Sequence, residues 1–343
     1  MPHAAGTAAF YANMLVHSEI SRYNTFGQTQ FERREDGMKK LLVTGGTRFV
    51  SRYTAECFAA KGYEVYVLNR GTQPQSPGVR LIAADRHDLA DRLKGYHFDA
   101  VLDITAYTKQ DVADLLDGLG CFDKYILLSS SAVYPETGAQ PFGEGDPLGP
   151  NKFWGKYGTD KIEAERELLG RVPGAYILRP PYLYGPMNNV YRESFVFECA
   201  LRGRKFYLPG EGGMKLQFFH VDDLCRFMET VLERAPEQHI FNVGNREAVT
   251  VEEWVRLCYA AAGRTPEFVH VPGDVEQRKY FSFYDYEYYL DVTAQYRLMD
   301  GTTPLTEGLA ESFRWYAANK EKVAIKPFME YIDSNLNSKM EDI

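Results

Sequence analysis

Short apolar runs alternate with longer amphipathic stretches through the first half of the chain. The runs have the length of buried strands and end at glycine, asparagine or aspartate; they lie at residues 40–43, 64–68, 79–83, 100–104, 125–128 and 175–178. Helical periodicity follows Gly46 as far as Ala60 and recurs at residues 110–119 and 161–169. Strands that alternate with helices predict an α/β fold with a doubly wound parallel sheet.

The pattern loosens after Pro186. Helices are expected at residues 193–201, 222–234 and 251–262, and strands at 206–208 and 239–243. This half predicts a smaller α/β domain. Residues 1–37 are polar and aromatic without clear periodicity, so the fold is expected to begin at Met38; a tail, a packed arm and the product of an upstream start remain alternatives for them.

A glycine turn, T-G-G-T-R-F-V-S at residues 44–51, joins the first strand to the first helix. Such a turn presents backbone N–H groups and the helix dipole to a pyrophosphate. Against G-x-x-G-x-x-G, Gly45 takes the first position, Arg48 the second and Ser51 the third; a guanidinium at position 48 can contact a phosphate. The alternative is a structural turn in a fold that has lost its nucleotide. The candidate cofactor contacts here are Gly45, Thr47, Arg48, Phe49 and Val50.

The second strand ends at Asn69 and Arg70, where dinucleotide-binding folds carry an acid for the adenosine ribose. An arginine suits a 2′-phosphate, so NADP is favoured over NAD, although Asn69 can bond a ribose hydroxyl and Arg70 can be a solvated charge. Asp85, after the third strand, is a candidate adenine contact or a loop cap.

Residues 123–161 contain a possible acid–base group. A strand ends in three serines, and a later helix carries Tyr157 and Lys161, which lie on one face because they are four residues apart. A nearby ammonium is expected to lower the pKa of the phenol and make it a usable base. The pattern Y-x-x-x-K alone is more often an ordinary exposed helical pair.

Taken together, L-L-V-T-G-G-T, L-L-S-S-S-A-V-Y, Y-G-T-D-K, L-R-P-P-Y-L-Y-G-P, F-F-H-V-D-D and F-N-V-G-N resemble the extended short-chain dehydrogenase/reductase family, its NAD-dependent epimerase/dehydratase group. The resemblance implies a Rossmann dinucleotide-binding domain at residues 38–184, with a return at about 218–245, a substrate-binding domain mainly at 185–330 and a tail at 331–343. It also implies a homodimer. The implied catalytic residues are Ser130, Tyr157 and Lys161, with Ser131 as the alternative serine, and Pro180, Pro181 and Tyr182 lie on the nicotinamide side.

Departures from the family limit the substrate prediction. Tyr182 stands where UDP-sugar epimerases have asparagine, and Leu216, beside Lys215, where they have an arginine for the nucleotide diphosphate. Ser131 and Ala132 replace the acidic residues of dehydratases, which makes a dehydratase less expected. The turn G-G-T-R-F also resembles the chloroplast stem-loop RNA-binding subgroup.

Composition narrows the class of protein. A net charge of −8 argues against a broad nucleic-acid surface, and no apolar run is long enough to span a membrane. Five scattered cysteines without C-x-x-C predict reduced thiols in the cytoplasm and no zinc site. His220, Asp222 and Asp223 are expected to begin a helix, so no metal is predicted. The aromatic run at 280–289 is expected mainly to pack and to form strand surface, with an aromatic wall for a sugar or base as the alternative. Arg278, just before the run, is expected to be a surface charge, with a contact to an anionic substrate as the alternative.

The predicted function is NAD(P)-dependent oxidation–reduction or epimerisation at a hydroxyl or ketone of a sugar or nucleotide-sugar-like substrate. The alternatives are a simple NADP-dependent reductase, a cofactor-sensing regulator, and a non-catalytic or RNA-associated protein on the same fold.

Overall fold

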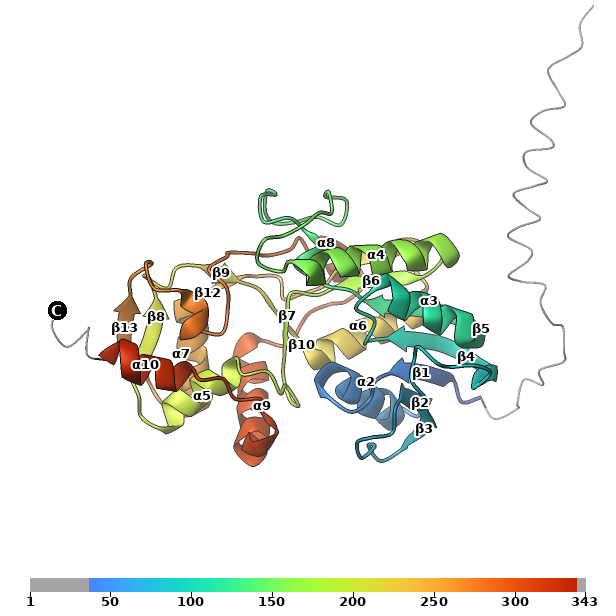
Figure 1. Ribbon diagram of the computed structural model, residues 1–343, viewed down its shortest axis with the longest axis horizontal. Helices are drawn as coiled ribbons and strands as arrows, with labels where there is room; N and C mark the ends of the chain where they lie inside the picture. Colours follow the sequence, from blue (N-terminus) through green and yellow to red (C-terminus); the bar gives the residue numbers. More distant parts are fainter. Residues whose placement is uncertain (1–36, 338–343) are drawn as a thin grey trace, which may run out of the picture. The chain divides into compact units, whose positions relative to one another are not determined.

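The computed structural model describes residues 37–337, and the segments 1–36 and 338–343, which contain most of the expected extension and half of the expected tail, lie outside the described residues. A seven-stranded parallel sheet is the centre of the fold (Figure 1). In spatial order it contains β11 (Ile240–Asn242), β6 (Tyr176–Arg179), β5 (Leu119–Leu128), β4 (Leu93–Asp103), β1 (Lys40–Thr44), β2 (Glu64–Asn69) and β3 (Val79–Ala83). The predicted doubly wound α/β fold is confirmed.

Helices cover both faces of the sheet, because the apolar runs of its central strands are buried on both sides. α2 (Phe49–Ala60) and α6 (Val221–Arg234) pack on one face, and α3 (Lys109–Gly118) and α4 (Lys156–Arg171) on the other (Figure 1). α3 begins at a capping box, in which the side chain of Thr108 accepts a hydrogen bond from the backbone of the third helical residue. The two helix layers leave the carboxyl edge of the sheet accessible to a ligand.

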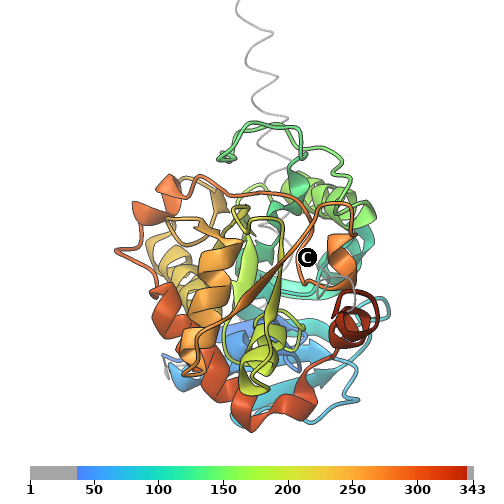
Figure 2. The same cartoon turned by 90° about the vertical axis from the view of Figure 1, so that its left-hand side faces the viewer.

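The second half of the chain forms a smaller α/β part with an aromatic core (Figure 2). Its elements are β7 (Tyr182–Tyr184), α5 (Glu193–Leu201), β8 (Phe206–Pro209), β9 (Lys215–Leu216), β10 (Phe218–His220), β12 (Val249–Thr250), α7 (Val251–Ala261), β13 (Phe268–Val271), α8 (Thr293–Tyr296), α9 (Leu305–Ala318) and α10 (Phe328–Asn335). β8 pairs with β13, and β7 with β10, each in parallel. No helix within residues 37–337 has the length and apolarity needed to cross a membrane.

Two expectations for this half differ from the structure. Residues 331–335, placed in a tail, continue α10, because Phe328, Ile332 and Leu336 are buried in the aromatic core. The aromatic run at 280–289 forms no strand of its own. Most of its rings are buried although the backbone is irregular, and Tyr284 and Tyr288 reach the cavity described below.

A buried ion pair ties the serine-containing loop to the sheet and to α4. Arg179 on β6 donates from Nε and Nη2 to Glu165 on α4, over 3.0 and 2.6 Å, and both residues are 2% exposed. The Oγ of Ser129 donates to the same carboxylate at 2.5 Å, and Nη1 of Arg179 donates to the hydroxyl of Tyr134 at 2.9 Å. The loop that follows β5 is therefore held from below by a satisfied polar network.

Candidate active site

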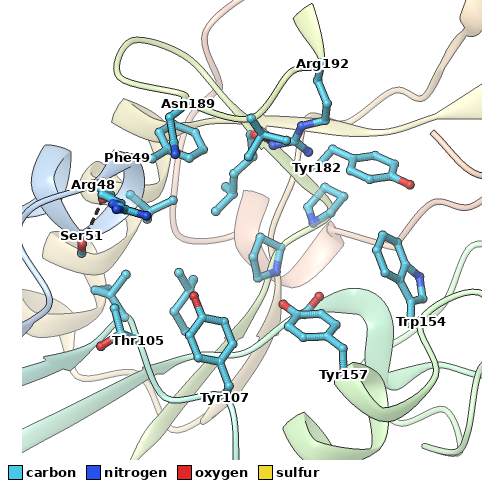
Figure 3. Close-up of a pocket in the computed structure, with 18 of the residues that line it drawn as sticks. Arg48, Phe49, Ser51, Thr105, Tyr107, Trp154, Tyr157, Tyr182, Asn189 and Arg192 are labelled. Carbon is cyan, nitrogen blue, oxygen red and sulfur yellow. Dashed lines mark hydrogen bonds between the residues drawn. The ribbon is translucent and has the colours of Figure 1, made fainter. Parts of the chain in front are cut away.

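A cavity of about 600 Å³ lies at the carboxyl edge of the sheet, where the strand order reverses between β1 and β4. The loops after β1, β4, β5 and β6 line it, together with the start of α4 and segments of the second half. Figure 3 shows Arg48 on one side of the cavity and Tyr157, Tyr182 and Arg192 on the other. The sheet edge therefore brings the predicted phosphate-binding turn and the predicted catalytic helix to one cavity.

The glycine turn bends at Gly45 and Gly46, whose φ angles of +93° and +90° lie in the left-handed region that favours glycine. A Cβ at Gly46 would lie 2.6 Å from Cγ1 of Val67, so the turn also needs the missing side chain. Arg48 has an extended backbone with φ −138°, so the position of the second motif glycine requires no glycine conformation here. Its side chain lines the cavity and has no ion pair or hydrogen bond within residues 37–337.

The start of α2 fits the pyrophosphate of a dinucleotide. Its first turn contains no acidic residue, and no side chain of the described part of the chain caps its N–H groups, so free donors and the positive end of the dipole adjoin the cavity. Thr47, Phe49 and Val50, expected as cofactor contacts, line the same wall, as does Ser51. When bound there, a nicotinamide dinucleotide supplies a hydride donor or acceptor.

Asn69, Arg70 and Asp85 are not among the residues that line the cavity. The Nδ2 of Asn69 donates to the backbone oxygen of Gly45 at 2.6 Å, which holds the glycine turn against β2. Asp85 accepts a hydrogen bond from the backbone N–H of His87 at 3.0 Å, the geometry of a loop cap. Arg70 is exposed. Their contacts with ribose, 2′-phosphate and adenine stay predictions.

Ser130 and Tyr157 both line the cavity, and the hydroxyl of Ser130 lies near enough to the phenol of Tyr157 to lower its pKa. Ser130 also accepts a hydrogen bond from the backbone N–H of Ala132 at 3.1 Å, which fixes the direction of its hydroxyl. The neighbouring Ser131 is buried and engaged elsewhere, since its Oγ donates to the backbone oxygen of Pro180 at 2.9 Å and lies 2.5 Å from the hydroxyl of Tyr288. Of the two serines considered, Ser130 is the one whose hydroxyl reaches Tyr157.

Lys161 lines the cavity with a buried side chain, and its ammonium is held by backbone carbonyls. Its Nζ donates to the backbone oxygens of Ala106 and Leu128, at 2.7 and 2.8 Å, and lies 6.0 Å from the ring centre of Tyr157. Burial lowers the pKa of Lys161 to about 8, although Asp103 favours its charged form. Burial raises the pKa of Tyr157, and the nearby Ser130 hydroxyl only partly opposes this. The predicted lowering of the phenol pKa is therefore wrong for this structure.

Four further aromatic residues complete the walls. Tyr107 and Trp154 were missed by sequence reasoning, whereas Tyr284 and Tyr288 belong to the aromatic run that was considered as a wall for a sugar or base. Tyr107 lies beside Tyr157, with ring centres 6.3 Å apart, and its ring covers the ammonium of Lys161 at 5.0 Å. Trp154 lies 6.2 Å from the ring of Tyr157 on the other side, and 6.0 Å from Tyr182. Tyr284 and Tyr288, from the aromatic run, also line the cavity. No motif marks these positions; only the fold brings them together.

The guanidinium of Arg48 should strengthen dinucleotide binding. A charge-assisted hydrogen bond contributes about 1.5–3 kcal/mol, so we expect Arg48→Gln to weaken dinucleotide affinity by roughly 10- to 100-fold in a calorimetric titration. Arg52→Gln is the matched control, because Arg52 pairs with Glu56 at 2.8 Å on the same helix and does not line the cavity. Equal dinucleotide affinities for the two variants would show that the Arg48 side chain does not contribute to dinucleotide binding.

A sequence model described as the NAD dependent epimerase/dehydratase family matches the chain at residues 41–117 and 106–244. The chain belongs to this family. The match spans the glycine turn, the serine loop, the tyrosine helix and β11. This chain is therefore an NAD(P)-dependent enzyme of the extended short-chain dehydrogenase type.

The names of individual relatives describe different functions. This chain is 29% identical over 301 residues to the chloroplast stem-loop binding protein of 41 kDa b of Arabidopsis thaliana, and the match covers 80% of this chain and 78% of that protein. The Thermotoga maritima UDP-glucose 4-epimerase solved with UDP-glucose matches with a TM-score of 0.66 and 21% identity, over 82% of this chain and 99% of that one. The Bacillus anthracis dTDP-glucose 4,6-dehydratase solved with NAD matches with a TM-score of 0.65 and 19% identity, over 83% and 98%. These structures share its fold.

Proposed function

We propose that this protein is an NAD(P)-dependent oxidoreductase or epimerase that acts on a hydroxyl or ketone of a sugar or nucleotide-sugar-like substrate through Ser130, Tyr157 and Lys161. The carrying observation is that Ser130, Tyr157 and Lys161 line one cavity, which continues to the glycine turn. The Thermotoga maritima epimerase and the Bacillus anthracis dehydratase, which have the same fold, support a sugar nucleotide as substrate class.

Each of the three side chains has one task at the reacting oxygen. Ser130 orients the substrate oxygen by a hydrogen bond, and Tyr157 takes a proton from that oxygen or returns one to it. Lys161, fixed by two backbone carbonyls, has one further donor for a ribose hydroxyl of the cofactor and places a positive charge below Tyr157.

The finer assignments rest on the sequence. Arg70 at the end of β2 favours NADP over NAD. The family resemblance favours a homodimer, and the scattered free cysteines fit a reducing compartment such as the cytoplasm.

A turnover screen tests the proposal. The full-length protein is incubated with oxidised or reduced NAD or NADP and a panel of UDP-, GDP- and dTDP-linked sugars, free sugars and sugar phosphates. Nicotinamide absorbance reports net oxidation or reduction, and chromatography reports epimers. We expect turnover of at least one panel member; absence of both turnover and dinucleotide binding would contradict the proposal.

RNA association is the second candidate, favoured by the name of the Arabidopsis thaliana relative. The net charge of −8 opposes it, since backbone phosphates attract basic surfaces. Salt-sensitive retention on a stem-loop RNA, with no dinucleotide bound, would favour it over the redox enzyme.

A further inference from the structure

Basic side chains gather in a cavity to which no aspartate or glutamate of residues 37–337 contributes, although the whole chain has a net charge of −8. Three of them, Arg192, Arg278 and Lys326, lie in the wall supplied by the second half of the chain. Arg192 stands at the start of α5, Arg278 in a 3-10 turn, and Lys326 between α9 and α10. Within residues 37–337 none of the three forms an ion pair with a carboxylate.

Their hydrogen-bonding groups are only partly used. The Nη2 of Arg192 donates to the backbone oxygen of Leu183 at 2.7 Å, whereas its Nε is buried without a hydrogen-bond partner. Arg278 donates from Nη1 to the backbone oxygens of Ser282 and Phe281, which leaves its other N–H groups free. An unpartnered buried donor is costly, so this arrangement is expected to have a ligand.

The three charges are also close enough to oppose one another. Burial lowers the pKa of Lys326, and Arg278 and Arg192 lower it further. Like charges held together without an acid destabilise the ligand-free protein, and a bound anion would remove that repulsion. The cluster therefore has the electrostatics of an anion site.

This site is not the one that the family resemblance predicted. Leu216, at the position of the nucleotide-binding arginine, is fully buried, and the adjacent Lys215 does not line the cavity. Aromatic rings lie between the basic cluster and Tyr157. Trp154 lies 6.2 Å from Tyr157 and 6.0 Å from Tyr182, and the guanidinium of Arg192 lies 5.5 Å above the ring of Tyr182.

We propose that Arg192, Arg278 and Lys326 bind a phosphate group of the substrate, either a sugar phosphate ester or the diphosphate of a nucleotide sugar. The sugar ring then lies along the aromatic wall between this group and Tyr157. Planar guanidinium groups suit the oxygens of a phosphate, and the lysine adds a point charge. The inference rests on the proposed function for the nature of the substrate, but the binding site itself does not depend on turnover.

Calorimetric titration of the full-length protein tests the site. The probes are UDP, glucose 1-phosphate, glucuronate and uncharged methyl glucoside, and the proteins are the wild type, Arg278→Gln/Lys326→Gln and Lys279→Gln. Lys279 is the matched control because it pairs with Glu276 at 3.3 Å and does not line the cavity. We expect a phosphate probe to bind the wild type and Lys279→Gln equally, and the double variant at least about 100-fold more weakly, as for the loss of two charge-assisted contacts.

The probes separate the two sources of phosphate. Tighter binding of UDP than of glucose 1-phosphate indicates a nucleotide sugar, and the reverse order indicates a sugar phosphate. Failure of both to bind the wild type, binding of glucuronate alone, or equal binding by the double variant would overturn the proposal. Unchanged thermal unfolding verifies that the variants are folded. A Tyr157→Phe protein should bind UDP like the wild type. Probe binding therefore tests the anion site separately from turnover, which tests the redox function.

Discussion

Tyr157→Phe is expected to lower kcat by roughly 100- to 10,000-fold, the usual contribution of a positioned acid–base group. The variant keeps the ring that packs against Tyr107 and Trp154, and loses only the phenol hydroxyl. Substrate and cofactor should therefore still bind while proton transfer at the substrate oxygen fails. The measurement is kcat on whichever sugar the turnover screen identifies, together with calorimetric dinucleotide affinity, which should change little.

Tyr107→Phe is the control for this prediction. Tyr107 is a second phenol in the same cavity, 51% exposed, and its hydroxyl has no hydrogen-bond partner within residues 37–337. Its removal should leave kcat within a few-fold of the wild type. A Tyr157→Phe enzyme as active as the Tyr107→Phe enzyme would assign the chemistry to another residue.

Arg179→Met is expected to destabilise the folded protein by about 3–5 kcal/mol, because it leaves the carboxylate of Glu165 buried without its partner. Denaturant unfolding gives the free energy directly. Arg179→Met/Glu165→Leu should recover most of the loss, since replacing a whole buried ion pair by apolar groups is often nearly neutral.

Arg166→Met tests whether burial is the cause. Arg166 forms an ion pair with Glu163 on the same helix, but both side chains are more than half exposed, so its removal should cost less than about 1 kcal/mol. An effect of Arg179→Met no larger than this would mean that the buried network does not hold the serine loop in place.

The sheet could be predicted from the sequence because each of its strands has a local sequence signal. Apolar runs bounded by turn residues located six of the seven strands, and residues 239–243 located β11. The two-residue strands β9 and β12 carry no such signal, since their backbone is held by the partner strand and their length is too short for alternation. α10 was missed because its buried face has only Phe328 and Ile332.

The site was predictable where residues are neighbours in sequence. Tyr157 and Lys161 share one helix, and the turn residues follow one strand, so spacing alone places them. Arg192, Arg278 and Lys326 are far apart along the chain, and only the folding of the second half brings them to one wall. The direction in which the pKa of Tyr157 shifts could not be predicted from the sequence either. It depends on the burial of the phenol and on the groups to which the ammonium of Lys161 donates hydrogen bonds.

Titration of the full-length protein with NADH and with NADPH, each followed by competition with ADP-ribose, tests the central claim that this cavity holds a nicotinamide dinucleotide beside Tyr157. We predict that at least one reduced dinucleotide binds at one site per chain, is displaced by ADP-ribose, and binds more weakly to Arg48→Gln. Absence of binding by both dinucleotides would contradict the account.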